Sequence, residues 1–108
     1  MEIGVRWWRR VAVRGPSMSP TVRDGDVLLV RFGGEPSPGD VVLVRWSARP
    51  EQLSVKRAVR PEGGGWWVLG DNPFGSTDSR VLGPADVVGI ASARMWPQPG
   101  RLRPAPHS

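Results

Sequence analysis

Apolar residues along the chain come in short runs separated by polar turn residues. Most of these runs are rich in Val and Trp and are bounded by Gly, Pro or Asp. Such runs are typical of β-strands, and no segment sustains the 3.6-residue apolar period of an amphipathic helix. The pattern predicts strands at residues 11–13, 27–32, 41–46, 53–59, 66–69 and 87–96.

Two of the predicted strands repeat one another. Residues 25–31 (Gly-Asp-Val-Leu-Leu-Val-Arg) and residues 39–45 (Gly-Asp-Val-Val-Leu-Val-Arg) are identical at six of seven positions. Each segment begins with a Gly-Asp turn, which is a common way to enter a strand. A linker rich in Gly and Pro, residues 33–38, joins them. We expect the two segments to form neighbouring antiparallel strands.

The length and the turn content favour one small all-β domain. A chain of 108 residues builds a single core, and its 14 glycines and 12 prolines favour short strands over long helices. We expect a short basic N-terminal segment with tryptophans at residues 1–10 and the folded domain at residues 11–96. Residues 97–108 are rich in Pro and are expected to form a disordered tail.

The composition excludes several kinds of catalytic site. The chain contains no Cys, so disulfides, thiol catalysis and Cys-ligated metals are excluded. The single histidine, His107, lies in the Pro-rich tail, which leaves little basis for a histidine triad or a His-ligated metal site. We expect neither a metal nor a cofactor.

The net charge of +5 raises the question of a nucleic-acid partner. Fourteen of the fifteen basic residues are Arg, spread along the chain with no run longer than two, and no recognised nucleic-acid-binding motif accompanies them. We therefore expect no nucleic acid as partner.

No apolar stretch approaches the roughly 18 residues of a membrane span, and the first residues do not resemble a secretory signal. The expectation is a soluble, cytoplasmic protein, with its oligomeric state left open.

The six tryptophans leave peripheral contact with a membrane as a second location. Trp7 and Trp8 stand between Arg6 and the pair Arg9-Arg10. Trp favours the membrane–water boundary, and Arg is attracted to anionic lipids. The alternative, which we favour, is that most of the tryptophans pack in the small core.

Lys56 is the only lysine of this arginine-rich chain. Arg keeps its proton in proteins, whereas Lys can lose it when burial disfavours the charged form. The single Lys therefore indicates a site that needs a neutral amine, although one surface Lys retained by chance would give the same count. In a strand, Lys56 shares its face with Ser54 and Ala58, which leave room for a dry pocket. Arg57 falls on the opposite face, where we expect it to meet solvent.

Two polar segments could complete such a site. Residues 15–21 (Gly-Pro-Ser-Met-Ser-Pro-Thr) form a turn that presents the Ser17 hydroxyl beside backbone amides, and residues 70–80 (Gly-Asp-Asn-Pro-Phe-Gly-Ser-Thr-Asp-Ser-Arg) offer small polar groups that can orient a base. A neutral amine can accept a Ser proton, and an amide can stabilise the oxyanion. Taken alone, each segment also fits an ordinary turn.

Together these segments resemble the signal-peptidase-like (S26) serine proteases, which use a Ser-Lys dyad. Four motifs follow in order: Ser-Met-x-Pro-Thr at 17–21, Gly-Asp-Val at 25–27, Lys-Arg with apolar residues at 56–59, and Gly-Asp-Asn followed by Ser-x-Asp-Ser-Arg at 70–80. They cover roughly residues 11–95. The resemblance implies a serine endopeptidase whose catalytic core is a small, partly closed barrel or folded antiparallel sheet.

The resemblance also implies a role for each matching residue. Ser17 would be the nucleophile and Lys56 the general base, and the backbone N–H of Ser17 would contribute to the oxyanion hole. Ser76 would hydrogen-bond to the Lys56 amine and orient it. Asp78 and Arg80 would form a structural ion pair that holds the last loop near the site.

Several features depart from the family's usual pattern. Gly15 stands where many members have a hydroxyl that serves as a second oxyanion donor, and the anchoring helix and the large β insertion before the last motif are missing. This compact form is most similar to the maturation proteases of nickel-type superoxide dismutase. It implies that the substrate is a precursor protein with an N-terminal extension. Met18 corresponds to a family residue near the substrate pocket, although it fits core packing equally well.

Three other functions stay open at this point: an anchorless signal peptidase, a self-cleaving peptidase of the SOS type, and a non-catalytic, basic β-barrel binding module. Autocleavage of the purified protein would favour the second. The binding module predicts that Lys56→Arg is harmless, whereas every Ser-Lys peptidase would lose its base with that change.

Overall fold

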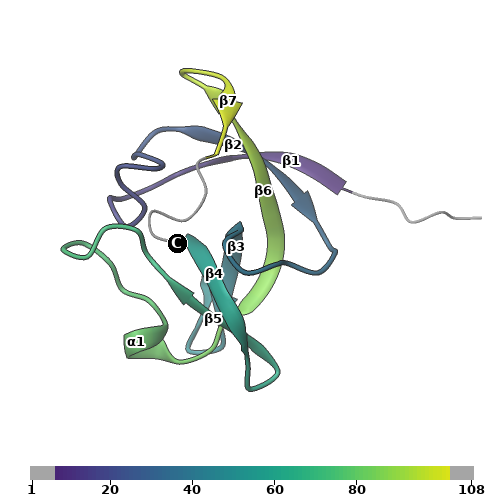
Figure 1. Ribbon diagram of the computed structural model, residues 1–108, viewed down its shortest axis with the longest axis vertical. Coiled ribbons are helices and arrows are strands. Elements are labelled where there is room, and N and C mark those ends of the chain that lie inside the picture. The colour runs from purple at the N-terminus through teal and green to yellow at the C-terminus, as the bar shows by residue number, and fades with distance from the viewer. Residues whose placement is uncertain (1–6, 103–108) are drawn as a thin grey trace, which may run out of the picture.

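The computed structural model describes residues 7–102, which form one folded antiparallel sheet with almost no helix (Figure 1). This confirms the expected all-β class. The expected strands at 27–32 and 41–46 have the predicted bounds, whereas the strand around Lys56 is twice as long as predicted. The elements are β1 (Trp7–Ala12), β2 (Val27–Phe32), β3 (Val41–Trp46), β4 (Arg49–Glu62), β5 (Gly65–Leu69), α1 (Ser79–Leu82), β6 (Asp86–Trp96) and β7 (Gly100–Arg101).

The strand order is β1-β2-β6-β3-β4-β5, with β7 paired to β6. The expectation that the two repeated segments are neighbours is therefore wrong, because β6 lies between β2 and β3 and runs antiparallel to both. With 11 residues, β6 is long enough to pair along both edges. The backbone N–H and C=O groups on both edges of β6 therefore find hydrogen-bond partners in β2 and β3. If β2 and β3 paired directly with each other, β6 would need other partners. The repeat reflects shared strand entry rather than shared pairing.

The core consists of two clusters on the two faces of β3. The side chains of this strand alternate between them, as the pleat requires, and this explains why its apolar run is almost continuous. The turn that carries Ser17 is anchored in the first cluster by Met18 and Val22. The first cluster holds Val13, Met18, Val22, Leu28, Val30, Val41, Leu43 and Val55. The second holds Val42, Val44, Trp46, Ala58, Trp66, Val68, Ala85 and Ile90.

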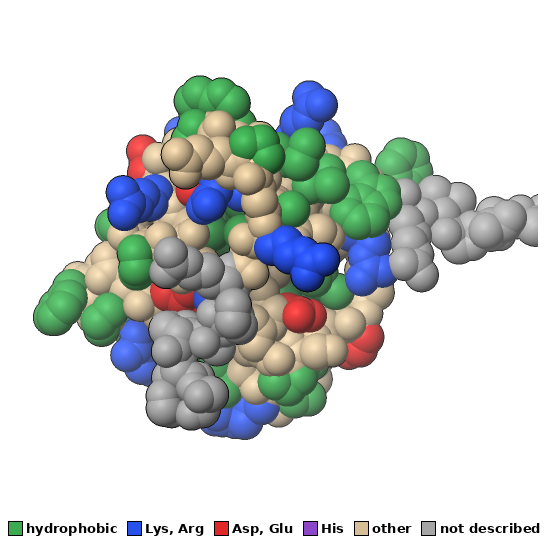
Figure 2. Space-filling view, turned by 45° about the horizontal axis from the view of Figure 1, so that its top comes forward, with side chains coloured by type: hydrophobic (Ala, Val, Ile, Leu, Met, Phe, Trp, Pro, Cys, Tyr) green, Lys and Arg blue, Asp and Glu red, His purple; other side chains and the backbone are tan. Residues whose placement is uncertain are grey.

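The tryptophans divide between core and surface. Trp46 and Trp66 are buried, whereas Trp7, Trp8 and Trp96 are exposed. The strand register places Trp7 opposite one end of β2 and Trp96 opposite the other end, so the exposed tryptophans do not form a single surface. On the face drawn in Figure 2, Lys and Arg side chains are scattered among apolar ones rather than gathered in one patch.

The two ends of the described chain are more ordered than expected. Strand β1 already begins at Trp7, within the segment predicted to precede the domain. Gly100–Arg101 pairs with β6 and Leu102 packs against the first core cluster, whereas we expected disorder from Pro97 onward. Residues 1–6 and 103–108 lie outside the described part. Between residues 7 and 102, no helix has the length and apolar character needed to cross a bilayer.

Gly89 in the middle of β6 gives a test of the sheet packing. A Cβ at this position would lie 2.6 Å from Val30 Cγ1 and 3.1 Å from the Arg31 carbonyl oxygen. Overpacking of this kind costs about 1–3 kcal/mol. We expect Gly89→Ala to lower the free energy of unfolding by this amount in urea titrations. In the matched control, Gly100→Ala, the new Cβ meets no atom within 4 Å. Equal free energies of unfolding of the two variants would contradict the close packing of Val30 and Arg31 against Gly89.

Candidate active site

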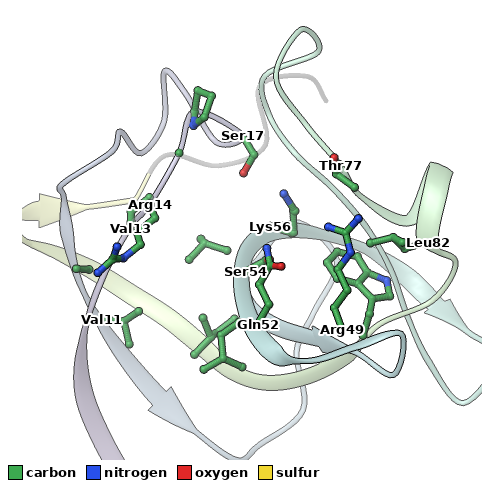
Figure 3. Close-up of a pocket in the computed structure, with 17 residues that line it drawn as sticks. Val11, Val13, Arg14, Ser17, Arg49, Gln52, Ser54, Lys56, Thr77 and Leu82 are labelled. Atoms are coloured by element: carbon green, nitrogen blue, oxygen red, sulfur yellow. The ribbon is translucent and has the colours of Figure 1, made fainter.

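A pocket of about 540 Å³ lies between the turn after β1 and the first half of β4. Ser17 lines it from the turn and Lys56 lines it from β4. Their side chains point toward one another across the pocket (Figure 3). Its volume falls within the range of small-molecule and peptide side-chain sites. The structure therefore brings together the two residues on which the sequence analysis placed the chemistry.

Lys56 is almost completely buried, with 4% of its surface exposed. It lies opposite Val42 in the register of β3 and β4, and Ala58 on the same face is also buried. Burial lowers the pKa of the Lys56 amine, and the nearby Asp78 carboxylate offsets part of this effect. Within residues 7–102 the amine has neither a hydrogen-bond partner nor an ion pair. The surroundings thus favour the neutral amine.

Arg57, the next residue along β4, is buried rather than solvent-exposed, so that expectation is wrong. Its Nε and Nη2 lie 3.2 and 2.6 Å from the two carboxylate oxygens of Asp71, and its Nη1 donates to the Gly39 carbonyl at 2.9 Å. Thr21 donates its hydroxyl to the same carboxylate at 2.6 Å. A buried charge is tolerated when it is paired and hydrogen-bonded, and Asp71 supplies that partner on the face opposite Lys56.

The turn that carries Ser17 is attached directly to the segment after β5. The Asn72 amide donates to the Ser17 carbonyl at 2.8 Å, and the Asn72 side chain donates to the Pro16 carbonyl at 3.0 Å. Gly70 allows the close approach, because a Cβ there would lie 2.7 Å from the Ser17 oxygen and would overlap Ser76 Oγ. The N–H of Ser17 has no acceptor in the described part of the chain. It is available to hydrogen-bond an oxyanion.

Asp78 is the hydrogen-bonding centre of the last motif. It accepts from the Gly70 amide at 2.9 Å, from Ser76 Oγ at 3.1 Å and from Arg80 Nη2 at 2.8 Å. Burial by itself would raise the pKa of Asp78, but the hydrogen bonds from Arg80, Gly70 and Ser76 together lower it to about 2. The structure thus contains the Asp78–Arg80 ion pair. The Ser76 hydroxyl donates to Asp78 and forms no hydrogen bond with Lys56 within residues 7–102, so its orienting role stays a prediction.

Two further positions bear on the sequence-based expectations. Thr77, which we did not single out, lines the pocket and stands near Lys56 in Figure 3, whereas Ser76 is not among the lining residues. Met18 has no exposed surface and packs in the first core cluster, so it offers a substrate nothing to contact. Within residues 7–102, no group of His, Asp and Glu side chains is placed to hold a metal ion.

The family model described as Peptidase S24-like matches residues 10–91, and the chain belongs to this family. The chain is also 37% identical over 116 positions to the mitochondrial ATP-independent inner membrane protease subunit 1a of Arabidopsis thaliana. The match covers 79% of this chain and 68% of that relative. These similarities confirm the prediction of a peptidase.

The buried ion pair gives the next prediction. Asp71→Asn removes the charge that faces the buried Arg57 guanidinium, so we expect it to lower the free energy of unfolding by about 3–5 kcal/mol. Glu62→Gln is the matched control, because Glu62 pairs with Arg60 on the surface, where an ion pair contributes about 1 kcal/mol or less. Urea titration of both variants measures the difference. Similar losses in the two would show that the buried pair does not hold the site together.

Proposed function

We propose that this protein is a serine endopeptidase in which Ser17 is the nucleophile and Lys56 the general base. The observation that carries the proposal is the convergence of these two side chains in one pocket, where burial lowers the pKa of the amine. The use of Lys at this position, in a chain that otherwise uses Arg for positive charge, supports the same assignment.

The geometry suggests the following sequence of steps. The neutral Lys56 amine accepts the Ser17 proton while Oγ attacks the peptide carbonyl carbon. The resulting oxyanion accepts a hydrogen bond from the Ser17 N–H. The Lys56 ammonium then donates its proton to the leaving amine, which leaves an acyl ester on Ser17. Finally, Lys56 takes a proton from a water molecule that attacks the ester. The acyl group leaves as the new carboxyl end, and the Lys56 ammonium returns the proton to Ser17 Oγ. Gly15 cannot add a side-chain donor to the oxyanion hole.

For the substrate, we infer a precursor protein that loses an N-terminal extension, with nickel-type superoxide dismutase as the first candidate. The support is analogy with compact members of the resembled family. In this chain, β4 and β5 are joined by the two-residue turn Gly63-Gly64, so the lysine and the last motif are separated by a simple hairpin. The alignment with the Arabidopsis relative runs over 116 positions but includes only 79% of this 108-residue chain, so the relative has residues within the aligned region that this chain lacks.

The dyad is tested by two substitutions. We expect Ser17→Ala and Lys56→Arg each to lower the rate of cleavage by at least about 100-fold, since Arg keeps the charge but cannot accept the proton. Intact mass of a co-expressed nickel superoxide dismutase precursor reports the cleavage. The matched control is Arg60→Lys, an exchange on the surface away from the pocket.

The possible outcomes separate the two parts of the proposal. Full cleavage by Ser17→Ala or by Lys56→Arg would contradict the dyad. If the wild-type protein leaves the precursor uncut but cleaves another protein such as casein, the substrate assignment is contradicted and the peptidase assignment stands. Fragments of the purified protein incubated alone would instead indicate a self-cleaving peptidase.

The pH dependence of cleavage tests the base. Because only the neutral amine of Lys56 can accept a proton, kcat/KM should be low at acid pH and rise as the amine deprotonates. The inflection should lie below the usual lysine pKa of 10.5, since burial lowers the pKa of Lys56. Asp78, with a pKa of about 2, stays ionised between pH 5 and pH 10 and adds no inflection there. An inflection at the ordinary lysine value would count against Lys56 as a desolvated base.

A further inference from the structure

Strand β4 carries three extra residues in an irregular bulge where it borders the pocket. Val44 of β3 lies opposite Ser54 and Trp46 lies opposite Arg49, so two positions along β3 correspond to five along β4. In a regular strand only alternate side chains face the same way, whereas the consecutive residues 52–56 all line this pocket. Bulges re-aim side chains in this manner and are common beside active sites. The extra residues also place Arg49 on the pocket wall.

Arg49 presents its guanidinium to the same space as Lys56. In Figure 3 the Arg49 side chain rises beside Lys56, toward Thr77 and Leu82. Trp46, its register partner, is buried and fixed by a hydrogen bond from its indole nitrogen to the Gly83 carbonyl at 2.8 Å. Arg49 itself is exposed and forms no hydrogen bond or ion pair with any described residue. Its donors are therefore open to a bound peptide.

Apart from the Lys56 amine, which its surroundings favour in the neutral form, the ionisable residues that line the pocket are two arginines, Arg14 and Arg49. No carboxylate is among the lining residues. Glu51 belongs to the same bulge, but it is exposed and forms no ion pair with any residue between 7 and 102. The Asp78 carboxylate is already held by Arg80 and the Gly70 amide. A concave site with charge of one sign attracts the opposite charge, so this pocket favours acidic side chains.

We propose that Arg49 is a specificity residue that selects substrates with Asp or Glu within a few residues of the cleaved bond. The planar guanidinium offers paired N–H donors that match a carboxylate, and such charge-assisted hydrogen bonds are stronger than neutral ones. Arg14 adds positive charge from the opposite wall. The proposal rests on the proposed peptidase function, because it assigns the pocket to the substrate.

The test measures binding separately from cleavage. The probes are three blocked octapeptides, acetyl-(Ala-X)4-amide, in which X is Glu, Gln or Lys. They are titrated into ¹⁵N-labelled Ser17→Ala protein, and NMR chemical-shift changes give the dissociation constants. We expect the Glu peptide to bind about tenfold more tightly than the Gln peptide. Arg49→Gln should reduce this preference about fivefold, and Arg49→Lys should retain part of it. Arg101→Gln, which removes a charge on β7 away from the pocket, should leave the preference unchanged.

Several results would overturn the proposal. One is equal binding of the Glu and Gln peptides, or no binding of any of the three. Another is an equal loss of preference in Arg49→Gln and Arg101→Gln, because this would mean that only net charge matters. The NMR spectra themselves report whether each variant is folded. Wild-type protein that prefers the Glu peptide but cleaves no peptide or protein would refute the peptidase, whereas cleavage of the Gln and Glu peptides with equal kcat/KM would refute only the specificity.

Discussion

The buried ion pair between Arg57 and Asp71 is the constraint on which the geometry of the site depends. Its members come from β4 and from the segment after β5, and Thr21 joins them from the end of the turn that carries Ser17. Removing two charges from water costs several kcal/mol per ion, and only well-formed hydrogen bonds offset that cost. The three segments therefore hold one relative position. Since Lys56 precedes Arg57 on the strand, fixing one face of β4 also fixes the amine on the other.

The two basic residues at the centre of the fold have opposite electrostatic environments. Arg57 meets the Asp71 carboxylate and the Gly39 carbonyl. Lys56 is buried beside a carboxylate that Arg80, Gly70 and Ser76 already engage. Desolvation outweighs the attraction of Asp78, so the pKa of Lys56 falls. The contrast explains why the chain has Lys at one position and Arg at the next: only one of the two is able to give up its proton.

Local chemistry made much of this structure predictable. The strands β2 and β3 follow from Gly-Asp turns and apolar runs, and Lys56 stood out because no other lysine is present. Pairing between distant strands was not predictable, because β2 and β3 carry nearly the same sequence and either could accept β6 on its edge. The buried position of Arg57 was missed for a similar reason. The alternation of side chains along a strand predicts which face of the strand a residue lies on, but it does not predict which distant segment packs over that face. Asp71, 14 positions along the chain, covers that face, and its only signal was its place in the last motif.

The proposed chemistry requires that the Lys56 amine be neutral near physiological pH, and the composition of the chain makes this measurable. Lysine labelled with ¹³C at Cε would give a single side-chain signal, because the chain contains one lysine. Its chemical shift, followed by NMR from pH 5 to pH 12, gives the pKa of Lys56 without any substrate. The account predicts a midpoint below the usual 10.5 in the folded protein and a return to the ordinary value on unfolding in urea. A midpoint at the ordinary value in the folded protein would contradict the assignment of Lys56 as the general base.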